Sequence, residues 1–65
     1  MNIDQLKGNW KNLKGKVKEK WGKLTDDDLK LIEGRKDQLE GKLQERYGIA
    51  REEAKKQLEE FVNAL

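Results

Sequence analysis

Apolar side chains recur every three or four positions along the first 24 residues, and this spacing is the strongest constraint on the fold. At 100° per residue they fall within one arc of about 80°, which is the apolar stripe of an amphipathic α-helix. We therefore expect a helix over residues 3–21. The stripe consists of Ile3, Leu6, Trp10, Leu13, Val17, Trp21 and Leu24.

Three shorter segments with helical periodicity follow. We expect helices over residues 26–33, 36–47 and 51–64, because glycines stand between the segments where left-handed residues commonly end helices. These glycines are Gly22, Gly34 and Gly48. The side chains expected to point inward are Leu29, Ile32, Leu39, Leu43, Tyr47, Ala54, Leu58, Phe61, Val62 and Leu65.

The second expected helix has a strong start signal and the fourth does not. Thr25 precedes three aspartates, which suits an N-cap hydroxyl followed by carboxylates in the first turn. The corresponding position before the fourth helix is Ala50, which cannot cap. Residues 26–28 are also a conceivable calcium or magnesium site, but the loop pattern of an EF-hand is absent, so we expect capping and no metal.

An internal repeat defines the architecture. Residues 13–22 (LKGKVKEKWG) return as residues 39–48 (LEGKLQERYG), with five of ten positions identical and three more of the same class. Each copy is a helix, a glycine and a second helix. We therefore predict one all-α domain over residues 1–65, with four helices arranged as two packed helical hairpins related by an internal pseudo-repeat.

The composition excludes most chemistry. The chain has no Cys, His, Ser or Pro, so the usual nucleophiles, the usual neutral-pH base and the commonest metal ligand are missing. Tyr47 lies on the apolar stripe, and no nucleophile–base pair is visible. We expect no enzymatic activity, no cofactor and a monomer. No stretch approaches the roughly 20 apolar residues of a membrane span, so we expect a cytoplasmic protein.

The lysines of the first helix are the one candidate binding feature. Residues 1–24 carry a net charge of +5, whereas residues 25–65 carry −3. Lys11, Lys14 and Lys18 lie outside the apolar stripe and form a candidate face for nucleic acid or anionic lipid. The alternative is an ordinary solvated face, since both tryptophans belong to the stripe and are expected in the core.

Three further glycines lack an explanation in the sequence. Gly8, Gly15 and Gly41 lie within expected helices and opposite the apolar stripes, where each weakens a helix by about 1 kcal/mol relative to Ala. Close approach of a partner helix is one interpretation, and a loosely stable helix is the other. Both remain open.

Four segments carry a resemblance to a known family: residues 8–10, 13–19, 21–29 and 44–48 (GNW, LKGKVKE, WGKLTDDDL and QERYG). They are similar to the CsbD-like family of small bacterial stress-response proteins, over residues 2–58. The resemblance implies a bacterial cytosolic protein with a SAM-domain-like four-helix fold, made in quantity under stress, and it brings no catalytic residues. The hydrophilic, Cys-free composition is also similar to that of hydrophilins.

Two functional hypotheses follow. The first is a non-enzymatic stress-response protein that acts as a soluble protectant or interaction module, with client proteins as its partners. The second is weak binding of nucleic acid or an anionic membrane surface through Lys11, Lys14 and Lys18.

Overall fold

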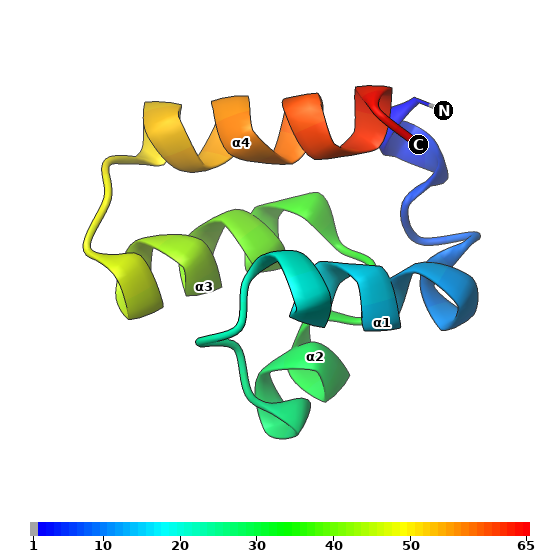
Figure 1. The fold of residues 1–65 in the computed structure, drawn as a ribbon, viewed down its shortest axis with the longest axis horizontal. Helices are drawn as coiled ribbons and strands as arrows, with labels where there is room; N and C mark the ends of the chain where they lie inside the picture. Colours follow the sequence, from blue (N-terminus) through cyan, green and yellow to red (C-terminus); the bar gives the residue numbers. More distant parts are fainter. Residues whose placement is uncertain (1) are drawn as a thin grey trace.

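A computed structural model describes residues 2–65, and they form four α-helices and one short 3₁₀-helix (Figure 1). Residues 2–65 contain no strand, so the predicted all-α four-helix class is confirmed. Helices α3 and α4 lie side by side and run in opposite directions (Figure 1). The elements are η1 (Ile3–Gln5), α1 (Trp10–Lys20), α2 (Asp26–Ile32), α3 (Lys36–Tyr47) and α4 (Arg51–Asn63).

The apolar stripes of the four helices meet in one core. Most of the predicted inward side chains are buried there, while Ile3, Trp10 and Tyr47 are partly buried against it. Leu65 was expected inward and is exposed, because α4 ends at Asn63 and the last residue leaves the helix face. The core consists of Leu6, Leu13, Val17, Trp21, Leu24, Leu29, Ile32, Leu39, Leu43, Ala54, Leu58, Phe61 and Val62.

The first expected helix is broken, which corrects the prediction of one helix over residues 3–21. η1 begins at an Asn2 cap, whose Oδ1 accepts from the Asp4 N–H at 2.7 Å. The chain then turns over residues 6–9, and α1 begins at Trp10. Gly8, a weak helix former, therefore lies in the turn and not inside a helix.

The glycines expected to end helices behave differently from one another. Gly34 and Gly48 have positive φ angles of 79° and 65°, as a left-handed residue after a helix requires. Gly22 does not, so its expected left-handed role is wrong. α1 ends because Trp21 itself leaves the helical region, with φ −117° and ψ 79°.

Gly34 has a second role that the sequence did not indicate. A Cβ atom there would lie 2.6 Å from the Cα of Lys7 and 3.0 Å from the Cβ of Trp10. The turn between η1 and α1 therefore packs directly on the backbone after α2. Only glycine combines this contact with a positive φ angle.

Trp21 fixes the end of α1 in the core. Its ring centroid lies 5.1 Å from that of Phe61 on α4, and its Nε1 donates to Gln57 Oε1 at 3.1 Å. The basic first helix is thus one wall of the core.

Candidate functional site

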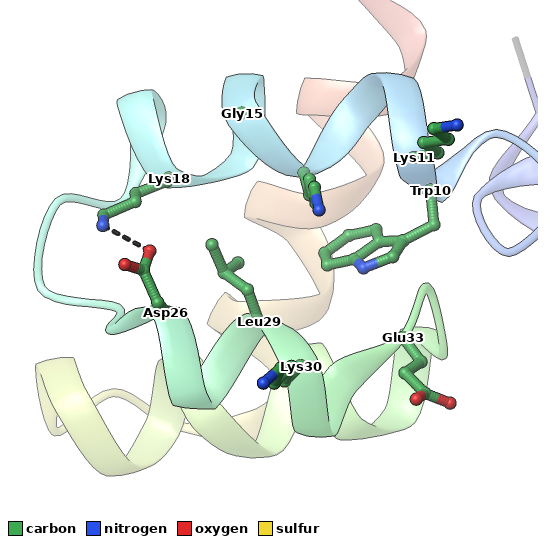
Figure 2. A pocket seen from close by; sticks show the side chains of 9 residues that line it. Trp10, Lys11, Gly15, Lys18, Asp26, Leu29, Lys30 and Glu33 are labelled. Carbon is green, nitrogen blue, oxygen red and sulfur yellow. Dashed lines mark hydrogen bonds and ion pairs between the residues drawn. The ribbon is translucent and has the colours of Figure 1, made fainter.

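A groove lies between α1 and α2. Its volume is about 490 Å³. The two helices run in opposite directions along it, so that Lys18 and Asp26 lie at one end and Trp10 and Glu33 at the other (Figure 2). We call it the α1–α2 groove. It is lined by Trp10, Lys11, Lys14, Gly15, Lys18, Asp26, Leu29, Lys30 and Glu33.

All three lysines of the predicted binding face line this groove. Lys11, Lys14 and Lys18 follow one another on the same side of α1 and are solvent-exposed. Lys30 of α2, which the sequence analysis did not single out, joins them across the groove. The sequence could not indicate Lys30, because its proximity to the lysines of α1 depends on how α1 and α2 pack.

One of the three lysines already has a partner. Lys18 Nζ lies 2.6 Å from Asp26 Oδ1, an ion pair that closes one end of the groove (Figure 2). The hydrogen bond and the charge of Lys18 lower the pKa of Asp26, and the charge of Lys14 adds to this effect. The pair is exposed to solvent, so it screens the charge of Lys18 more than it stabilises the fold.

The two tryptophans differ in their surroundings. Trp21 is buried, as predicted for both tryptophans, whereas Trp10 is only partly buried. Figure 2 shows the Trp10 ring extending from α1 across to α2, beside Leu29. Leu29 is only 6% exposed, so the partly buried Trp10 ring is the larger of the two apolar surfaces that the groove presents.

Gly15 lies on the α1 side of the groove. No atom lies within 4 Å of the Cβ that a side chain would add there, and the same holds at Gly41 on α3. Close approach of a helix within this chain therefore explains neither glycine. At Gly15 the missing side chain leaves the groove open.

Thr25 caps α2, as predicted, and Asp28 completes a capping box with it. Thr25 Oγ1 accepts from the Asp28 N–H at 3.1 Å, and Asp28 Oδ2 accepts from the Thr25 N–H at 3.0 Å. At the start of α4, Ala50 makes no side-chain cap, also as predicted. Within residues 2–65, no cluster of three or more acidic side chains is arranged to hold a metal ion.

Asp28 also forms an ion pair that the sequence analysis missed. Arg46 on α3 donates to both of its carboxylate oxygens, and Lys42 Nζ lies 3.5 Å from Oδ1. The Arg46 hydrogen bond and that of the Thr25 backbone hold the pKa of Asp28 well below its usual range. This cluster is structural, since its oxygens are all engaged with the chain itself.

The fold and the groove define a class of protein: a small all-α protein with a basic, partly apolar groove between its first two helices. A family model described as CsbD-like matches residues 4–56. The chain belongs to this family.

Similar proteins come from several bacteria. The chain is 61% identical over 61 residues to the UPF0337 protein ECA0631 of Pectobacterium atrosepticum, covering 94% of this chain and 88% of that protein. It is 59% identical over 58 residues to the UPF0337 protein YjbJ of Escherichia coli K12, covering 89% and 84%. It is 60% identical over 65 residues to the UPF0337 protein RPA4217 of Rhodopseudomonas palustris, covering 100% and 98%. These names state no activity.

None of the helices in residues 2–65 combines the length and the apolar character that crossing a bilayer requires.

Proposed function

We propose that this chain is a non-enzymatic stress-response protein of the bacterial cytoplasm that acts as a soluble protectant or interaction module. The observation that carries the proposal is the surface. Charged residues make up 43% of the chain, and among the large apolar side chains of residues 2–65 only Leu31 and Leu65 are exposed. The association with stress rests on membership of the CsbD-like family.

The physical basis of protection is a strongly hydrated surface with little tendency to associate with other proteins. Interspersed lysines and acidic residues keep a protein dispersed at high concentration, and few apolar contacts are offered to neighbours. Such a protein remains between client molecules as water is withdrawn, and it reduces the encounters through which partly unfolded clients aggregate.

The test is protection of a drying- and heat-sensitive client enzyme. We expect the client to keep more activity with this protein than with an equal mass of a neutral globular protein. A Leu58→Asp variant, with a charge in the core, tests whether protection needs the folded structure. Loss of protection in this variant would assign protection to the fold, and unchanged protection would assign it to the hydrophilic composition. Equal recovery with the neutral control contradicts the proposal.

A second candidate function is weak polyanion binding through Lys11, Lys14 and Lys18. Its support is that all three lysines line the α1–α2 groove on one side of α1. Replacing them with Glu should abolish binding of single-stranded DNA or anionic vesicles, and binding by the unmodified protein should weaken steeply with salt. Salt-independent binding contradicts this function.

A further inference from the structure

We infer that the α1–α2 groove is a binding site for a small anionic amphiphile, with an apolar group against Trp10 and Leu29 and one anionic group between Lys14 and Lys30. This site goes beyond the protective role and does not depend on it.

The size of the groove suits a small molecule. Its volume of about 490 Å³ lies in the range of roughly 300–1,000 Å³ that is typical of small-ligand sites. The α2 side is a helix of seven residues, about 10 Å long. A docked helix or a long strand of nucleic acid would extend far beyond this wall.

The surface of the groove is amphipathic. Trp10 is the one tryptophan that the core leaves partly exposed, and its ring lies beside Leu29 between the two helices (Figure 2). Aromatic and aliphatic surface of this kind gains free energy when an apolar group covers it. The lysines around this surface favour a negatively charged group elsewhere on the same ligand.

The order of charges along the groove favours a ligand with a single anionic group. Asp26 lies at one end and Glu33 at the other (Figure 2). Lys14 and Lys30 come between these ends on their helices, and neither has an ion-pair partner among residues 2–65. At one end Lys18 is already paired with Asp26, and at the other end Glu33 would repel a second anionic group, whereas a carboxylate or phosphate held midway would lie between Lys14 and Lys30.

Gly15 fits this assignment. It weakens α1 as a helix, and no packing within the chain requires it, since a Cβ there would touch nothing within 4 Å. Because Gly15 lines the groove, any side chain at this position would fill space that the ligand needs.

The probe is sodium dodecanoate, titrated into the ¹⁵N-labelled full chain below the concentration at which it forms micelles. We expect saturable one-to-one binding, with amide shifts confined to residues 10–18 and 26–33. The indole N–H signal of Trp10 should move and that of the buried Trp21 should not.

Two matched pairs of variants locate the site. The double variant Lys14→Gln/Lys30→Gln should weaken binding roughly tenfold, through loss of two charge-assisted contacts. The control Lys16→Gln/Lys56→Gln, with the same net charge, should bind within about twofold of the unmodified protein. Gly15→Gln should block the groove, whereas Gly41→Gln, equally free of contacts on α3, should not.

Several outcomes overturn the inference. They are the absence of saturable binding, shifts spread outside the two segments, or equal effects of groove and control variants. Binding to phosphatidylglycerol vesicles without binding of free dodecanoate also overturns it and points to a membrane surface. Tighter binding of a single-stranded oligonucleotide through the same lysines overturns it in favour of the polyanion function. Failure of client protection changes none of these readouts, so the two proposals fail separately.

Discussion

Arg46 on α3 clamps the carboxylate of Asp28 at the start of α2, with Nε donating to Oδ2 at 2.9 Å and Nη2 donating to Oδ1 at 3.0 Å. The same carboxylate accepts from the Thr25 N–H, so one buried side chain both caps α2 and ties it to α3. Two-point contacts of this kind between Arg and a carboxylate fix orientation as well as distance. This contact ties α2, which forms one side of the α1–α2 groove, to α3.

Removal of the Asp28 carboxylate should destabilise the fold. Asp28→Ala keeps the Thr25 hydroxyl cap but loses the hydrogen bond from the Thr25 N–H and those from Arg46, and we expect the free energy of unfolding to fall by about 2 kcal/mol. Urea denaturation followed by circular dichroism measures this change. The matched control is Asp27→Ala, an exposed aspartate in the same turn, which should cost less than half as much. Equal losses would show that the Arg46 contact adds nothing.

The same carboxylate should make stability depend on pH. The pKa of Asp28 is lower in the folded protein than its value of about 3.9 in an unfolded chain. Between these two values the unfolded state binds more protons, so the contribution of Asp28 is complete above the unfolded pKa and is lost as pH falls toward the folded one. Between pH 7 and pH 2 the free energy of unfolding should therefore fall more steeply with decreasing pH for the unmodified protein than for Asp28→Ala. An equal pH dependence in the two proteins would contradict this prediction.

Gly34 should tolerate substitution less well than Gly48. Both have positive φ angles, so Ala at either position costs about 1 kcal/mol in backbone strain. At Gly34 the new Cβ also meets the Lys7 backbone at 2.6 Å, whereas at Gly48 it meets nothing within 4 Å. We expect Gly34→Ala to lower the melting temperature by at least twice as much as Gly48→Ala. Similar losses would mean that the turn over residues 6–9 moves away freely.

The start of α4 offers a stabilising change. Ala50 occupies the N-cap with an extended backbone and no side-chain hydrogen bond to the first turn. Ala50→Thr supplies the missing acceptor and should raise the free energy of unfolding by about 1 kcal/mol, seen as a higher melting temperature. Thr25→Ala at the start of α2 is the reciprocal variant and should lower it by a similar amount. An unchanged melting temperature for Ala50→Thr would contradict the assignment of residue 50 as the N-cap of α4.

Sequence periodicity was a good guide to the core, because an apolar stripe has few ways to be buried. It placed Leu13, Val17 and Trp21 correctly, along with nearly every inward residue of the other three helices. It did not reveal the break before α1. The apolar spacing continues through residues 6–9 whether or not the backbone does, and Gly8 was the only local sign of a turn.

The candidate site was predictable only on the α1 side. Lys11, Lys14 and Lys18 are three and four residues apart, a spacing that places them on one side of any α-helix. The participation of Leu29, Lys30 and the half-buried Trp10 depends on how α2 packs against α1. Asp28 was predicted as a carboxylate in the first turn of a helix, but its contact with Arg46, 18 residues away, required the packing of α2 on α3.

The basic first helix is a wall of the core and not an arm that folds on a polyanion. The most direct test is the fluorescence of a Trp10→Phe variant, in which Trp21 is the only tryptophan, measured with and without single-stranded DNA at low salt. We expect a blue-shifted emission, protected from acrylamide quenching and unchanged by DNA, because Trp21 is only 3% exposed and contacts Phe61 and Gln57. A water-exposed emission that shifts to the blue when DNA is added would instead show that the first helix folds on the polyanion.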